Sequence, residues 1–335
     1  RRVGFQLFAH ALGPLLETGG PRPLGRVQGV AAQEAAADGA VRNHADTQRL
    51  RRRQHLEFRQ AAHERVHVLL ADESQEAPAP GVALGHRRLS IIDLSSGQQP
   101  LSNEDGSVWV AFNGEIYNFL DLYKELENKG HHFRTRSDTE VIVHAWEEWG
   151  EEAVTRFRGM FAIALWDERQ QVLWLVRDRV GKKPLYYLQD AERILFGSEI
   201  KSILQAPGVS REIDLEALSD YLSLLYVPSP KTIFKHVRKL PAAHYALVTR
   251  DDFRVKPYWD LSFHAEHGRS EQQMAEELMV ILDEATRMRM ISEVPLGSFL
   301  SGGVDSSSIV ALMAGESQEP VKTNSISFSV AQYNE

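Results

Sequence analysis

The strongest constraint on the fold is a series of short apolar runs, separated by turn residues, that starts at Gly81. Runs of this kind are typical of a β-rich domain with helices on its faces. They predict strands over residues 82–92, 108–112, 185–188 and 194–196. Two further pairs of runs, 160–166 with 172–177 and 245–248 with 255–259, predict antiparallel hairpins.

Apolar residues at helical spacing predict helices over residues 119–128, 138–157 and 214–225. The last of these helices is expected to end at the turn formed by Pro228, Ser229 and Pro230. Strands mixed with helices in this way predict an α+β fold built of packed layers.

The chain of 335 residues is long enough for two domains. Residues 1–80 are rich in Ala, Arg, Gln, His and Gly and have little apolar periodicity, so we interpret them as an atypical segment, disordered or mistranslated. Its end, residues 71–80, is polar with two prolines and is interpreted as a linker. One domain is predicted over 81–262, and a second starts at 270, where Ser270 caps a helix over 271–290.

Composition excludes several classes of function. A net charge of -8 argues against a nucleic-acid-binding surface, which needs a basic face. No run approaches the roughly 18 apolar residues of a membrane span, so we expect a cytoplasmic protein without membrane contact. With no cysteine, these residues provide no disulfide, no thiolate metal ligand and no thiol nucleophile.

A glycine turn between a strand and a helix predicts a phosphate site. Residues 294–300 are interpreted as the strand, 301–307 as the turn and 308–313 as the start of the helix. Glycines let backbone amides approach an anion, and a helix N-terminus adds partial positive charge. A carboxylate beside a phosphate suggests that Asp305 holds Mg²⁺. The alternative is a serine- and glycine-rich turn without a ligand.

The turn sequence SGGVDSS lacks the lysine of a Walker loop and instead resembles the pyrophosphatase loop of N-type ATP pyrophosphatases. These enzymes adenylate a substrate and release pyrophosphate. The resemblance implies ATP and Mg²⁺ as cofactors. It implies that the ATP site consists of Leu300, Ser301, Gly302, Gly303, Asp305, Ser306 and Ser307, with Asp305 on the metal.

Five motifs occur in order before this loop: GHRRLSIIDLS, FNGEIYN, SDTE, RDRVGKKPLYY and GSEIKSI. Together they resemble the class II glutamine amidotransferase domain of the glutamine-hydrolysing asparagine synthetases. The resemblance implies a layered αββα glutaminase domain of the N-terminal-nucleophile type, followed by the beginning of an α/β ATP pyrophosphatase domain. We interpret RDRVGKKPLYY as mainly structural.

The resemblance also assigns roles in glutamine binding. Arg88, with Leu89 beside it, would bind the α-carboxylate, because the arginine fork matches a carboxylate. Asp138 and Glu115 would receive the ammonium group. The side-chain N–H of Asn113 and the backbone N–H of Gly114 would form the oxyanion hole. Alternatively, Asn113 and Gly114 form a simple turn, Arg88 is a surface cation and Asp138 is a helix N-cap.

By resemblance, the function is ATP-dependent amidation of aspartate with ammonia from glutamine, in a possible homodimer. Glutaminases of this family begin with a cysteine, and residues 1–80 stand where that first strand is expected. Only one βα unit of the second domain precedes Glu335. We therefore expect a chain that is incomplete at both ends and inactive as written. An amidotransferase for another carboxylate, a ligase similar to β-lactam synthetase and a noncatalytic remnant stay open as alternatives.

Overall fold

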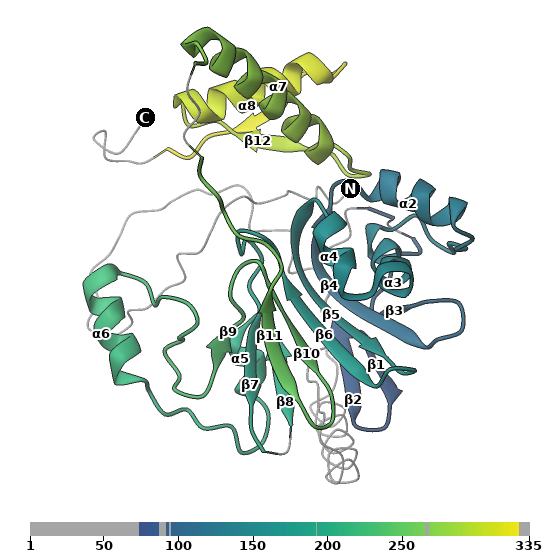
Figure 1. Ribbon diagram of the computed structural model, residues 1–335. Helices are drawn as coiled ribbons and strands as arrows, with labels where there is room; N and C mark the ends of the chain where they lie inside the picture. The colour runs from purple at the N-terminus through teal and green to yellow at the C-terminus, as the bar shows by residue number, and fades with distance from the viewer. Residues whose placement is uncertain (1–73, 87–91, 94, 192, 265–267, 328–335) are drawn as a thin grey trace, which may run out of the picture. The chain divides into compact units, whose positions relative to one another are not determined.

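The computed structural model describes residues 74–86, 92–93, 95–191, 193–264 and 268–327 (Figure 1). The atypical segment predicted at the start of the chain lies outside these residues up to position 73, and so do Arg88 and Leu89. None of the helices in the described ranges is long and apolar enough to span a bilayer.

A six-stranded sheet forms the centre of the first domain, with the strand order β11-β10-β6-β5-β4-β3. Its neighbouring strands all pair antiparallel. The strands are β3 (Leu101–Ser102), β4 (Val108–Ile116), β5 (Gly159–Asp167), β6 (Val172–Arg177), β10 (His244–Val248) and β11 (Phe253–Pro257). Both predicted hairpins, β5 with β6 and β10 with β11, are confirmed.

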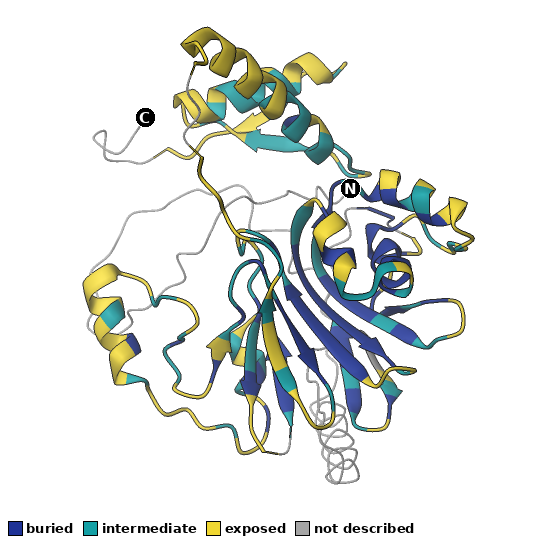
Figure 2. Ribbon diagram, in the orientation of Figure 1, coloured by how far each residue is buried: buried dark blue, intermediate teal, exposed yellow. Residues whose placement is uncertain are grey.

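Alternating side chains make both faces of this sheet apolar. On β5, Phe161, Ile163 and Leu165 belong to one buried cluster, while Ala162, Ala164 and Trp166 belong to a second. Successive strand residues point to opposite faces, so each face can bury its own layer. The helices α2 (Phe119–Asn128) and α3 (Asp138–Trp149) cover the first face, as the buried surfaces in Figure 2 show.

Two small sheets pack on the second face. One pairs β1 (Ser74–Ala79) with β2 (Val82–His86), and the other has the order β8-β7-β9. The strands of the latter are β7 (Tyr186–Gln189), β8 (Ile194–Gly197) and β9 (Arg238–Lys239). Behind them α5 (Ile200–Ile203) buries Ile203 in a third apolar cluster. The mixed α/β architecture expected from the sequence is confirmed.

Several predicted boundaries were wrong. Strand β1 lies inside the predicted linker 71–80. The strand predicted over 82–92 ends at His86, and residues 87–91 lie outside the described part of the chain. The helix predicted over 138–157 is broken, because Gly150 has φ of +55° and ends α3. Two short helices follow, η1 (Gly150–Glu152) and α4 (Ala153–Arg156).

The helix α6 (Leu215–Leu224) agrees with the prediction over 214–225 to within one residue at each end. Leu225 takes the left-handed conformation with φ of +63°, and its N–H bonds to the carbonyl of Tyr221. The helix therefore stops before Pro228. Asp214 caps the other end, where its side chain accepts hydrogen bonds from two backbone amides.

The C-terminal part starts with α7 (Glu271–Arg289), where Ser270 is the N-cap, as predicted, and forms a capping box with Gln273. Next, β12 (Gly297–Phe299) pairs in parallel with β13 (Lys322–Asn324), and α8 (Val304–Glu316) connects them. The helix predicted from residue 308 begins at Val304 instead. Asp305, Ser306 and Ser307 thus lie on its first turn rather than in the preceding loop.

Candidate active site

A cavity of about 460 Å³ opens where β4, the start of α3 and the end of β8 meet. It is lined by Asn113, Gly114 and Glu115 from β4 and by Asp138 from α3. These are four of the six glutamine-site residues predicted from the sequence; the other two, Arg88 and Leu89, lie outside the described residues. A cavity of this size suits a small-molecule ligand.

Asn113 and Gly114 take their places because of close packing between β4 and β5. A Cβ atom on Gly114 would lie 2.1 Å from the carbonyl oxygen of Met160, so only glycine fits. The Nδ2 atom of Asn113 donates a hydrogen bond to Oγ of Ser198 over 3.0 Å. Since a side-chain amide carries two N–H groups, this bond orients Asn113 and leaves a donor for a ligand.

Two buried carboxylates provide the negative charge of the cavity. Glu115 and Asp138 are only 4% and 6% exposed. The backbone N–H of Ile116 donates to Oδ2 of Asp138 over 3.0 Å, which ties the start of α3 to β4. The N-cap of α3 is Ser137, which accepts a hydrogen bond from the N–H of Thr139. The alternative role of Asp138 as the N-cap was therefore wrong.

Gln99 supports the same region and was not predicted. Its Oε1 accepts a hydrogen bond from the N–H of Phe112 over 2.7 Å, and its Nε2 donates to Oγ1 of Thr139 over 3.2 Å. It thereby bridges β4 and α3 beside the cavity. No local pattern around Gln99 indicates this role, because both partners are distant in sequence.

Lys183 also lines the cavity, although it lies in the motif predicted to be structural. Burial lowers the pKa of its amine, while the carboxylates of Glu115 and Asp178 act in the opposite direction. A cation in a cavity with two carboxylates moderates their negative potential. Its place in the RDRVGKKPLYY motif was the only available signal.

The remainder of that motif is structural, as predicted. The buried carboxylate of Asp178 accepts hydrogen bonds from the N–H groups of Phe161, Val180, Lys182 and Lys183. The guanidinium of Arg177 donates to the carbonyls of Gly181, Lys183 and Leu240. These bonds hold the turn that carries Lys183.

The predicted phosphate loop occupies the connection from β12 to α8. Gly302 has φ of +92°, a conformation that favours glycine. Leu300 N–H donates to the carbonyl of Asn324, and Ser301 N–H donates to Oγ of Ser306 over 3.3 Å. Gly303 is the N-cap of α8 and makes no side-chain capping bond. This helix N-terminus can therefore present backbone amides to an anion, with the exposed Asp305 on its first turn.

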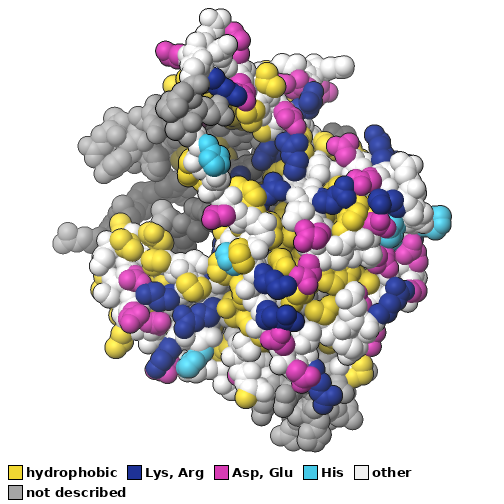
Figure 3. Space-filling model, viewed as in Figure 1, with side chains coloured by type: hydrophobic (Ala, Val, Ile, Leu, Met, Phe, Trp, Pro, Cys, Tyr) yellow, Lys and Arg dark blue, Asp and Glu magenta, His cyan; other side chains and the backbone are white. Residues whose placement is uncertain are grey.

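Charged side chains of both signs are interspersed over the face of the molecule in Figure 3. Lysine and arginine do not form a stripe on this face, and aspartate or glutamate lies between them.

Two family models match the chain in the same order as the two candidate sites. A family model for the glutamine amidotransferase domain matches residues 40–259, so the chain belongs to the glutamine amidotransferase family. A second model, for asparagine synthase, matches residues 277–335. Asparagine synthetase [glutamine-hydrolyzing] 1 of Bacillus subtilis is 42% identical over 76% of this chain and 40% of that protein. The predicted resemblance to the glutamine-hydrolysing asparagine synthetases is thus confirmed.

Two other matches are more distant. Amidase chyE of Penicillium rubens is 36% identical over 74% of this chain and 37% of that protein. The chain therefore spans about two fifths of the length of these relatives. Among solved structures, the glutamine phosphoribosylpyrophosphate amidotransferase of Bacillus subtilis gives a TM-score of 0.35 at 17% identity, covering 68% of this chain and 48% of that one. A TM-score this low supports no conclusion about the fold.

Proposed function

We propose that the protein acts in glutamine-dependent amidation of aspartate, with the first domain binding glutamine and the second binding MgATP. One observation carries the proposal: a single cavity gathers Asn113, Gly114, Glu115 and Asp138 from separate motifs. Helices α2 and α3 cover one side of two packed sheet layers, and α5 lies on the other side. This arrangement supports a layered αββα domain of the N-terminal-nucleophile type.

In the proposed complex, the ammonium group of glutamine lies against Glu115 and Asp138. Because both carboxylates are buried, a cation between them replaces the solvation that they lose. The amide carbonyl then points to Asn113 and Gly114, whose N–H groups stabilise negative charge on its oxygen when a nucleophile attacks. Arg88 completes the proposal as the partner of the α-carboxylate.

The loop after β12 fits the phosphates of ATP. Backbone amides of Gly302 and Gly303 and the hydroxyl of Ser307 would hold the anion. Ser301 and Ser306, which bond to each other, would exchange that bond for the phosphate. Leu300 precedes them. Asp305 offers the carboxylate oxygen that Mg²⁺ prefers. Bound MgATP supplies an adenylate leaving group, which turns an unreactive carboxylate into an electrophile.

Glutamine binding tests the first half of the proposal. Isothermal titration of L-glutamine into the 335-residue chain should show binding, and Asp138→Asn should weaken it roughly 10- to 100-fold, the loss of one charge-assisted hydrogen bond. The matched control is Asp121→Asn, on the exposed face of α2. Equal affinity in wild type and Asp138→Asn would contradict the site.

The acceptor has a second candidate. One relative is named an amidase rather than an asparagine synthetase, so a carboxylate other than that of aspartate is the second candidate. A longer chain that contains the rest of the asparagine synthase region decides between the two, through pyrophosphate release with aspartate or with other carboxylates. Release that is independent of aspartate would remove aspartate from the proposal. Light scattering tests the homodimer that the family resemblance implies.

A further inference from the structure

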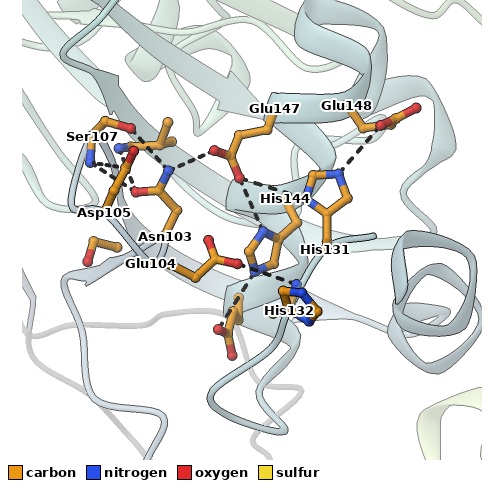
Figure 4. Close-up of polar contacts among 12 residues, drawn as sticks. Asn103, Glu104, Asp105, Ser107, His131, His132, His144, Glu147 and Glu148 are labelled. Carbon is orange, nitrogen blue, oxygen red and sulfur yellow. Dashed lines mark hydrogen bonds and ion pairs between the residues drawn. The ribbon is translucent and has the colours of Figure 1, made fainter. Parts of the chain in front are cut away.

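Two histidines and a glutamate gather at a place that is separate from the cavity (Figure 4). His144 and Glu147 lie one turn apart on α3, and His131 comes from the segment that follows α2. None of the three lines the cavity. The side chain of His144 is fully buried, whereas His131 and Glu147 are 16% and 19% exposed and can be reached by an ion from solvent.

The potential ligand atoms converge on one point. Nδ1 of His144 lies 3.2 Å from Oε2 of Glu147, and Nδ1 of His131 lies 3.9 Å from the same oxygen. One ligand atom from each of the three residues falls within 4.8 Å of the others. Around a tetrahedral Zn²⁺ with bonds of about 2.0–2.2 Å, ligand atoms lie roughly 3.3–3.6 Å apart. The two distances to Glu147 are within a few tenths of an ångström of this geometry, and the two histidine nitrogens, at most 4.8 Å apart, would approach each other on binding.

The other nitrogen of each imidazole faces a second carboxylate. Nε2 of His144 lies 3.7 Å from Oε1 of Glu140, and Nε2 of His131 lies 3.4 Å from Oε2 of Glu148. In metal sites, the ring nitrogen that does not bind the metal usually donates to a carboxylate, which fixes the tautomer and raises the basicity of the ligand. His131 follows that arrangement, and Nε2 of His144 faces Glu140 without a hydrogen bond; both rings turn Nδ1 toward Glu147.

The carboxylates themselves are held in place. Oε1 of Glu147 accepts a hydrogen bond from Nδ2 of Asn103 over 2.7 Å, which leaves Oε2 directed at the histidines. Glu140 accepts from the backbone N–H groups of Arg134 and Thr135. Supporting hydrogen bonds of this kind are typical of sites that orient a metal ligand.

We propose that His131, His144 and Glu147 bind a divalent transition-metal ion of the Zn²⁺ type, with the fourth coordination position open to water. Two imidazoles and one carboxylate are a ligand set that suits Zn²⁺. The ion would fasten the segment after α2 to helix α3.

A proton competes with the metal for this place. An imidazole binds a metal ion through a deprotonated ring nitrogen, so binding of the ion displaces any proton that these side chains share. The charged neighbours among the described residues favour a cation in sum, since four carboxylates face three basic groups: Glu104, Glu140, Glu147 and Glu148 against Lys129, Arg134 and Arg169.

Zn²⁺ titration of the metal-stripped 335-residue chain tests the proposal. Calorimetry in two buffers of different ionisation enthalpy should show tight binding of Zn²⁺ with release of a proton. Co²⁺ in place of Zn²⁺ should give the visible absorption bands of a tetrahedral site. The chain contains 13 histidines, and others among them can also bind Zn²⁺. The readout is therefore the single equivalent of bound Zn²⁺ that is present in the wild type and weakened in the variants. His131→Ala and Glu147→Gln should weaken that equivalent by at least roughly 10- to 100-fold.

His132→Ala is the matched control, because this exposed histidine is adjacent to His131 in the same segment. It should keep the wild-type stoichiometry and Co²⁺ spectrum. Circular dichroism confirms that each variant is folded; His144 is left unchanged because it is fully buried. If His131→Ala and Glu147→Gln both bind Zn²⁺ and Co²⁺ as the wild type does, the proposal is overturned, and His144 is a protonated histidine held between carboxylates.

Discussion

At the residue scale, Gly114 is the position in the proposed site where a side chain has no room. Its missing side chain allows β4 to approach β5, where a Cβ atom would meet the carbonyl oxygen of Met160 at 2.1 Å and Cα of Phe161 at 2.7 Å. Both of these atoms belong to the backbone, so a side chain cannot simply rotate away. The strand pair must separate to admit even a methyl group.

Gly114→Ala should therefore lower the free energy of unfolding by about 3 kcal/mol, the upper range for overpacking. It should also abolish glutamine binding in the calorimetric assay. Gly315→Ala, in α8, is the control, because an added Cβ there meets nothing within 4 Å. That change should be neutral or stabilising by up to about 1 kcal/mol. Urea unfolding curves compare the two, and equal stability of both variants would contradict the packing argument.

At the element scale, one partly buried contact links the sheet to the short helix after α3. Tyr245 on β10 donates to Oε2 of Glu151 on η1 over 2.5 Å, and Nζ of Lys256 lies 3.1 Å from the same oxygen. Burial raises the pKa of Glu151, but these two hydrogen bonds outweigh it and lower the pKa below its ordinary value of 4.5. The contact therefore stabilises the folded state above that value and loses its effect as the pH falls through the lowered pKa.

Tyr245→Phe should reduce the free energy of unfolding by about 0.5–1 kcal/mol at neutral pH, a modest effect because Glu151 is 38% exposed. The difference from wild type should vanish in acid, where Glu151 is protonated in both the folded and unfolded states. Tyr226→Phe, at a tyrosine that is 60% exposed, should change little at either pH. Urea unfolding followed by tryptophan fluorescence measures all three proteins. A pH-independent loss in Tyr245→Phe would mean that the hydroxyl acts through something other than Glu151.

At the scale of the whole molecule, the chain has a proposed binding site for glutamine but lacks the cysteine nucleophile that would hydrolyse it. The 335 residues contain no cysteine, so the proposed glutamine cavity has no thiol that could attack the amide. The polypeptide should bind glutamine yet release no glutamate, and it should release no pyrophosphate from MgATP with aspartate. Coupled assays for glutamate and pyrophosphate measure both. Turnover above the background of a mock preparation in either assay would show that another group performs the chemistry.

The sequence by itself determined the periodic elements and the motifs. Strands β5 and β6 and helix α2 are visible locally, because burial of a face imposes a period of two on a strand and near 3.6 on a helix. The loop of Ser301–Gly303 is equally local, since its glycines and the helix after it are neighbours in the chain. The break at Gly150 was missed because its apolar spacing continues into Ala153 and Val154, which are also buried.

Only the tertiary structure decided which distant residues meet. Asn113 and Ser198 are 85 residues apart and touch because β8 packs across the second face of the sheet that contains β4. Gln99 lies at the cavity through its bonds to β4 and α3, and Lys183 through the turn held by Asp178. His131 approaches His144 only when the segment after α2 folds back on α3. The periodicity of a sequence indicates which face of an element is buried. Strand order and layer packing decide which other element that face contacts, and no short stretch of sequence contains that information.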